Sequence, residues 1–179
     1  MTRKRLFTSD TLDAVAYIVL LLAVTSWVAI LCAKQLTYGL EFDESYLLGV
    51  ASNLASGSGY VDDGVTFLST SEPFSPVIST GPTVLVPVSL TLWIFDGDLL
   101  AVRITMLIFL GILLFSIWRL FGNLGGRWAS LAAVAGLALI PTVAPDLQNT
   151  SLMPGRVVGE LPALALLLLA GLLLSKHRY

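Results

Sequence analysis

The sequence predicts an all-α membrane protein with four transmembrane helices and a long external loop that carries juxtamembrane helices. Of its 179 residues, 56% are hydrophobic and only 12% are charged, and its mean hydropathy is +0.86. A soluble domain of average composition has about 25% charged residues. The apolar residues also gather in runs long enough to cross a hydrocarbon core of about 30 Å. We therefore expect membrane lipids, rather than nucleic acid, as the surroundings of this chain.

The first span is expected at residues 14–36, after a cytoplasmic tail at residues 1–13. The run from Ala14 to Ala33 holds 20 uncharged residues, which is enough to cross a bilayer. A secretory signal peptide is the competing interpretation. It is disfavoured because the apolar region of such a peptide is about 7–15 residues long.

Basic residues set the expected orientation and the number of spans. Loops on the cytoplasmic side of a membrane are enriched in Lys and Arg, so three basic clusters are predicted to be cytoplasmic: Arg3, Lys4 and Arg5; Arg119 and Arg127; Lys176 and Arg178. Both termini are then cytoplasmic, and the number of spans is even. The apolar run at residues 83–95 has only 13 residues and suits a re-entrant or interfacial segment better than a span.

Four spans result, with loops and tails between them in a definite order. The predicted segments are residues 1–13 (tail), 14–36 (span), 37–98 (external loop), 99–119 (span), 120–127 (cytoplasmic loop), 128–144 (span), 145–156 (external loop), 157–174 (span) and 175–179 (tail). The expected location is a multi-pass position in the cell (inner or plasma) membrane.

The first external loop is acidic and contains two expected juxtamembrane helices, at about residues 43–56 and 82–95. Eight of the twelve acidic residues lie in this loop, which has no Lys or Arg. Asp43 suits the N-cap of the first helix, but acidic residues gathered at a membrane boundary also indicate function. The second helix begins at Pro82, and its free N–H groups near Thr80 and Gly81 could hold a phosphate. An interfacial helix without a ligand fits equally well.

Charged residues near the other external ends are further candidates. Arg103 lies one turn inside the second span; it either extends to the interface or faces inward to pair with a carboxylate or an anionic ligand. The second external loop brings Asp146, Arg156 and Glu160 to the same side. Arg156 and Glu160 would share a helix face if the fourth helix began near Pro154.

Several motifs follow one another in a definite order along the chain: Asp43-Glu44 and Tyr46, Ala51-Ser52-Asn53-Leu54-Ala55 with Gly57 and Gly59-Tyr60, Glu72-Pro73, Thr80-Gly81-Pro82, Arg103, and Gly159-Glu160. This ordered set resembles the N-terminal part of the GT-C class of membrane glycosyltransferases, which includes protein O-mannosyltransferases, aminoarabinose transferases and arabinofuranosyltransferase-like enzymes.

The resemblance implies a reaction and roles for particular residues. A sugar would pass from a polyprenyl-phosphate donor to an acceptor hydroxyl on the non-cytoplasmic face, with Asp43 as the catalytic carboxylate and Glu44 beside it. Asp146 or Glu160 would assist with metal, phosphate or acceptor, and a divalent metal ion, if used, would be held by Asp43, Asp146 and Glu160. Arg103 and Arg156 are the candidates for contact with the donor phosphate.

Two other classes of function stay open. Members of the GT-C class run to several hundred residues, so the resemblance implies an opening module that works with the remainder of the enzyme or with a second subunit. A non-catalytic accessory or lipid-binding membrane subunit is the main alternative. A transporter ranks third, because the middles of the expected spans are empty of charge.

Overall fold

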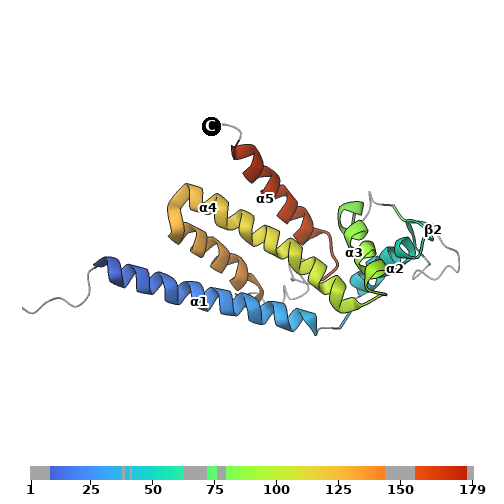
Figure 1. Ribbon diagram of the computed structural model, residues 1–179, viewed down its shortest axis with the longest axis horizontal. Coiled ribbons are helices and arrows are strands. Elements are labelled where there is room, and N and C mark those ends of the chain that lie inside the picture. The colour runs from blue at the N-terminus through green and yellow to red at the C-terminus, as the bar shows by residue number, and fades with distance from the viewer. Residues whose placement is uncertain are drawn as a thin grey trace, which may run out of the picture.

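The computed structural model describes residues 9–37, 39–40, 42–62, 72–75, 80–143 and 156–176, and within these ranges the fold is all-α apart from one short strand pair (Figure 1). The elements in chain order are α1 (Ser9–Leu36), α2 (Phe42–Ala55), β1 (Val61–Asp62), β2 (Glu72–Pro73), α3 (Pro82–Ile94), α4 (Leu99–Val143) and α5 (Glu160–Lys176).

Two of the described helices, α1 and α4, are long and apolar enough to cross a membrane. α3 and α5 are shorter apolar helices. α1 begins at Ser9, five residues before the expected span, because the acidic side chains of its first turns suit the positive end of a helix dipole.

α4 is a helical hairpin rather than one straight helix. Its backbone leaves the helical region at Gly125 (φ −142°, ψ 15°) and Gly126 (φ 72°, ψ −168°), and Figure 1 shows its two arms lying side by side. The hydroxyl of Ser130 donates a hydrogen bond of 2.9 Å to the carbonyl of Trp118 across the turn. The eight-residue loop expected at residues 120–127 is therefore wrong in extent. The helix continues up to Gly125, and the two glycines are enough to reverse the direction of the chain. Glycine can do this because it reaches backbone angles that other residues rarely adopt.

α1 runs alongside the second arm of α4 and in the same direction. Near its start, Asp13 contacts Arg127 and Trp128. Further along, the indole Nε1 of Trp27 donates a hydrogen bond of 3.2 Å to the carbonyl of Ala138. These contacts place the start of α1 and the glycine turn at one end of the molecule.

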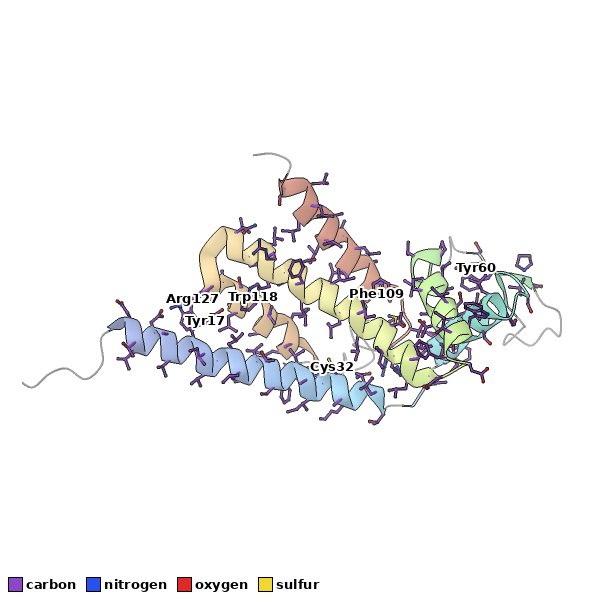
Figure 2. The ribbon with its side chains drawn as sticks, in the orientation of Figure 1. Tyr17, Cys32, Tyr60, Phe109, Trp118 and Arg127 are labelled. Carbon is purple, nitrogen blue, oxygen red and sulfur yellow. The ribbon has the colours of Figure 1, made fainter. Side chains whose placement is uncertain are left out.

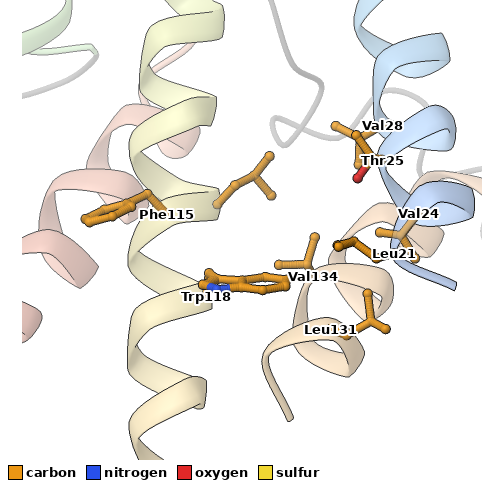
Figure 3. A pocket seen from close by; sticks show the side chains of 9 residues that line it. Leu21, Val24, Thr25, Val28, Phe115, Trp118, Leu131 and Val134 are labelled. Carbon is orange, nitrogen blue, oxygen red and sulfur yellow. The ribbon is translucent and has the colours of Figure 1, made fainter. Parts of the chain in front are cut away.

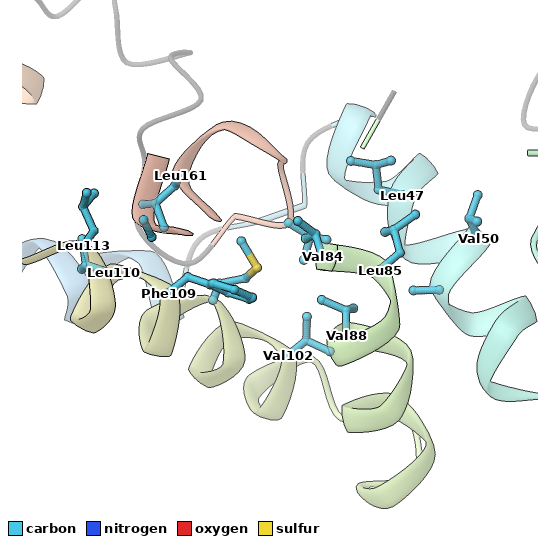
Figure 4. Packing of buried hydrophobic residues seen from close by; sticks show 14 of the residues in the cluster. Leu47, Val50, Val84, Leu85, Val88, Val102, Phe109, Leu110, Leu113 and Leu161 are labelled. Atoms are coloured by element: carbon cyan, nitrogen blue, oxygen red, sulfur yellow. The ribbon is translucent and has the colours of Figure 1, made fainter. Parts of the chain in front are cut away.

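The main core lies at the other end, where α2 and α3 pack against α4 and α5 (Figure 4). Each of these four helices contributes buried hydrophobic side chains: Leu47 and Val50 from α2, Val84, Leu85 and Val88 from α3, Val102, Phe109 and Leu113 from α4, and Leu161 from α5. A fully buried aliphatic side chain contributes about 1.5–3 kcal/mol. This cluster therefore fixes the two juxtamembrane helices against the long ones.

The ends of α2 and α3 follow the signals in the sequence. At the end of α2, Gly57 has a φ of 83°, and its N–H and that of Ser58 donate to the carbonyls of Leu54 and Asn53. This is the hydrogen-bond pattern of a Schellman motif, in which a left-handed glycine ends the helix. α3 begins with a proline in its first turn, as expected. α4 follows it after a tight turn.

Candidate functional site

A buried ion pair joins α2 to α4. Glu44 lies in the first turn of α2 and Arg103 in the second turn of α4, and both side chains are 1% exposed. Arg103 Nη1 donates to Glu44 Oε1 at 2.6 Å, and Arg103 Nη2 donates to Oε2 at 3.0 Å. This two-bond geometry is the strong form of an arginine–carboxylate contact. Of the two alternatives for Arg103, the inward-facing one with a carboxylate partner is the one observed.

The same carboxylate holds a third segment. The backbone N–H of Val157 donates a hydrogen bond of 3.1 Å to Glu44 Oε1. Val157 belongs to the segment that leads into α5, so one buried side chain joins α2, α4 and the segment before α5. A buried charge is costly unless it is paired and its remaining hydrogen-bonding sites are filled. Here the two guanidinium nitrogens and the backbone N–H do this.

Asp43 points the other way. It is the residue before Glu44 in the first turn of α2, and it is exposed. α2 begins at Phe42 rather than after Asp43, so the expected N-cap position is wrong by one or two residues. Asp43 instead adds negative charge to the first turn, where the helix dipole favours it. The outcome is an accessible carboxylate carried by a turn that the Glu44–Arg103 pair anchors.

The segment before α5 packs closely against Thr80. A Cβ atom added to Gly159 would lie 3.2 Å from Thr80 Oγ1, a separation tighter than ordinary van der Waals contact. The hydroxyl of Tyr60 donates a hydrogen bond of 3.2 Å to the carbonyl of Thr80. Gly81 then caps α3 with extended backbone, and no side chain bonds to this cap. Glu160, exposed in the first turn of α5, follows Gly159 directly.

The remaining predicted residues have different outcomes. Arg156 is only 5% exposed, and it precedes α5 instead of belonging to it. Since α5 begins at Glu160, the expectation that these two residues share a helix face is wrong. Asp146 lies outside the described residues, and so does Glu41. The structure thus gathers Asp43, Glu44, Thr80, Gly81, Arg103, Arg156 and Glu160 at one end of the molecule.

An aromatic cluster supports this end. The ring of Phe74 lies 5.7 Å from that of Tyr46 and 5.2 Å from that of Tyr60, measured between ring centroids. Burial raises the pKa of the Tyr46 hydroxyl, and a hydrogen bond with Asp62 and the negative charge of that carboxylate raise it further. Burial also raises the pKa of Tyr60. Both phenols therefore stay protonated at neutral pH.

Two contributors to this end, Phe74 and the Val157 amide, could not be predicted from residue type. Phe74 stands between Pro73 and Pro76, which argue against a regular helix there but do not place the ring. The Val157 amide is a backbone group that any residue except proline supplies.

The described residues include no group of three or more His, Cys, Asp or Glu side chains that could hold a metal ion. Asp43 and Glu160 are single exposed carboxylates, and the third residue expected for a divalent ion, Asp146, is not among them. What this end of the molecule offers chemically is an accessible carboxylate, a buried and neutralised ion pair behind it, and a second exposed carboxylate on the adjoining segment.

Comparison with known proteins returned no family model, no curated protein and no solved structure that matches this chain.

Proposed function

We propose that this chain is a membrane glycosyltransferase module of the GT-C type, which transfers a sugar from a polyprenyl-phosphate donor to an acceptor hydroxyl on the non-cytoplasmic face. The proposal places the end of the molecule that carries Glu44 and Arg103 on that face. It places the glycine turn of α4 and the start of α1 in the cytoplasm.

The observation that carries the proposal is the position of Asp43. This carboxylate is accessible, while the next residue along the chain, Glu44, is buried against Arg103 and the Val157 amide. The pair anchors the turn that presents Asp43. It also brings the segment that ends at Glu160 to the same end of the molecule. An accessible acid on a rigid support is what a positioned general base requires.

The chemistry assigned to this site is simple. The Asp43 carboxylate takes the proton of the acceptor hydroxyl, the acceptor oxygen bonds to the anomeric carbon of the sugar, and the bond from that carbon to the donor phosphate breaks. The polyprenyl phosphate leaves with the electron pair. Glu44 acts as a positioning residue because its oxygens are committed to Arg103. That pairing also removes Arg103 from the candidates for phosphate contact.

The rate of sugar transfer by the Asp43→Asn variant tests the proposal directly. The purified protein, alone and combined with the remainder of the enzyme or a partner subunit, is given a polyprenyl-phosphate sugar, and release of polyprenyl phosphate is measured. Loss of a general base lowers the rate by about 10²–10⁴-fold. Asp96→Asn is the matched control, because Asp96 is an exposed carboxylate in the turn between α3 and α4. Equal activity of the two variants would remove Asp43 from the mechanism.

Labelling of introduced cysteines tests the four-span arrangement. Ser58 and Asn123 are both exposed, and they lie near opposite ends of the molecule. Ser58→Cys should react with a membrane-impermeant maleimide added to intact cells, while Asn123→Cys should react only after the membrane is opened. Reaction of both from outside would contradict the four-span placement, in which the two arms of α4 and α5 each cross the bilayer.

A non-catalytic lipid-binding subunit is the second candidate, and a separate observation favours it. An apolar groove lies between α1 and the hairpin of α4, far along α1 from the site described above. This groove could hold the hydrocarbon tail of a lipid whether or not the protein transfers sugars.

A further inference from the structure

Four side chains close the end of the molecule where α1 begins. Arg127 forms an ion pair with Asp13, and Trp128 Nε1 donates a hydrogen bond of 3.1 Å to the same carboxylate. The Arg127 guanidinium lies 4.9 Å from the ring centroid of Tyr17. The rings of Tyr17 and Trp128 meet edge to face at 5.3 Å. Figure 2 shows Tyr17 and Arg127 close together at this end. We call these four residues the clasp.

An apolar groove of about 330 Å³ begins one helical turn beyond the clasp. Side chains from α1 and from both arms of α4 form its walls, as Figure 3 shows. They include Leu21 and Val24 from α1, Leu114 and Trp118 from the first arm, and Leu131 and Val134 from the second arm. Apart from the hydroxyl of Thr25 and the indole N–H of Trp118, the lining side chains are entirely apolar. Such a surface favours a hydrocarbon over any polar ligand.

The clasp and the groove are adjacent parts of one feature. Tyr17 lies four residues before Leu21 on α1, and Trp128 lies three residues before Leu131 on α4, so these two clasp residues are one helical turn from groove residues on the same helix face. Arg127 keeps 49% of its side chain exposed at this opening. Arg119, which follows Trp118 on the first arm, is exposed too.

We propose that the clasp and the groove together form a binding site for one anionic phospholipid, with its phosphate on Arg127 and Arg119 and an acyl chain in the groove. The identity of the ligand follows from two properties of the site, both of which the ligand must match. The groove selects a hydrocarbon chain, and the half-exposed Arg127 guanidinium at the clasp selects an anion. A phospholipid of the bilayer that α1 and α4 are suited to cross supplies both in one molecule.

The clasp carboxylate has a defined role in this site. Asp13 occupies part of the Arg127 guanidinium, so it competes with a lipid phosphate for the same donors. An arginine has five N–H donors and can bind both groups, but the negative charge of Asp13 opposes the arrival of a second anion. Asp13 therefore limits the affinity for anionic lipid while it holds α1 against α4. The site does not depend on sugar transfer, and it lies at the opposite end of the molecule from Asp43.

Native mass spectrometry of the detergent-purified full chain tests the proposal. The protein is titrated with a phosphatidylglycerol and with a phosphatidylcholine of the same acyl chains, and the occupancy of a single bound lipid is measured for each. Phosphatidylglycerol is expected to bind at least fivefold more tightly, since one arginine near an anionic lipid contributes about that factor. Inorganic phosphate at millimolar concentration should displace neither lipid, because it lacks the chain. Equal affinity for the two lipids, or displacement by phosphate alone, would overturn the proposal.

Three variants and one control separate the parts of the site. Arg119→Gln should weaken phosphatidylglycerol binding about fivefold, and Val134→Phe should weaken binding of both lipids by filling the groove. Lys34→Gln, which removes an exposed cation from the other end of α1, should change neither.

Asp13→Asn gives the sharpest contrast, because it removes the competing charge and keeps Arg127. Binding of phosphatidylglycerol should become at least twofold tighter in this variant, while phosphatidylcholine stays unchanged. If the Asp13–Arg127 pair served only to hold α1 against α4, Asp13→Asn would loosen the groove and lower its affinity for lipid. Weaker phosphatidylglycerol binding by Asp13→Asn, or an unchanged affinity in Val134→Phe, would therefore contradict the assigned site.

Discussion

Replacing the buried Glu44 with Gln should destabilise this fold more than a single substitution of an exposed or half-exposed polar residue does. The substitution leaves the Arg103 guanidinium charged and 1% exposed, without the carboxylate that now accepts two of its N–H groups. Breaking a buried ion pair from one side costs about 3–5 kcal/mol. The retained amide carbonyl still accepts one hydrogen bond, which places the expected loss near the lower end of that range, at about 3 kcal/mol.

The free energy of unfolding in mixed detergent micelles measures this loss, and a double-mutant cycle assigns it. Arg103→Met and the double variant Glu44→Gln/Arg103→Met complete the cycle. Because the double variant contains no buried charge, it should be about as stable as the more stable single variant or better, which gives a coupling energy of about 3 kcal/mol or more. Asp43→Asn, one residue away and exposed, is the matched control and should shift stability by less than about 0.5 kcal/mol.

Two results would refute this reasoning. The first is a loss of less than about 1 kcal/mol in Glu44→Gln, which would mean that Arg103 finds solvent or another partner at no cost. The second is a double variant whose loss equals the sum of the two single losses, which would mean that the two side chains do not depend on each other.

Three further predictions concern the backbone and the helix contacts. Gly57→Ala should cost about 1–2 kcal/mol, since its φ of 83° disfavours a Cβ atom; Gly49→Ala, inside α2 with open space around it, should instead raise the unfolding free energy by about 0.5–1 kcal/mol. Gly126→Ala should cost about 1–3 kcal/mol, because its φ of 72° and ψ of −168° belong to a region used almost only by glycine, and a loss below 0.5 kcal/mol would contradict the turn geometry. Trp27→Phe should cost about 1 kcal/mol through loss of its hydrogen bond to the second arm of α4, visible as a shift in thermal unfolding that Trp93→Phe, an exposed residue, does not cause.

The helices themselves were largely predictable from the sequence. Long apolar runs and the glycine and proline signals locate α1, α2, α3 and α5 to within a few residues at most of their ends, because each run is bounded by charged residues or turn formers. The hairpin of α4 was harder. The sequence places a charged loop at residues 120–127, but the polar residues there continue the helix, and the chain reverses only at Gly125 and Gly126. The residue types alone do not predict that two glycines are enough to reverse the direction of the helix.

The spacing of apolar residues in α2 does not predict which of Asp43 and Glu44 is buried. Asp43 lies four and seven residues before the buried Leu47 and Val50, and Glu44 lies three and seven residues before the buried Leu47 and Ala51. Both carboxylates therefore flank the buried face of α2 by similar offsets. What decides between them is a cation 59 residues later in the chain. No local pattern contains that information, although the sequence did offer inward pairing as one of two fates for Arg103.

The charged groups at the two ends of the molecule follow opposite physical logic, and this separates the two proposals. At the Glu44 end, the pair is fully buried, so its strength depends on complete pairing and is insensitive to salt. At the clasp, Asp13 and Arg127 are about half exposed, so their attraction is weak and screened by salt, and the guanidinium keeps N–H donors for a lipid phosphate. High salt should therefore loosen lipid binding at the clasp while the anchored turn that presents Asp43 keeps its position. A chain that lost both with rising salt would contradict the separation, because the buried pair lies outside the reach of the dissolved ions.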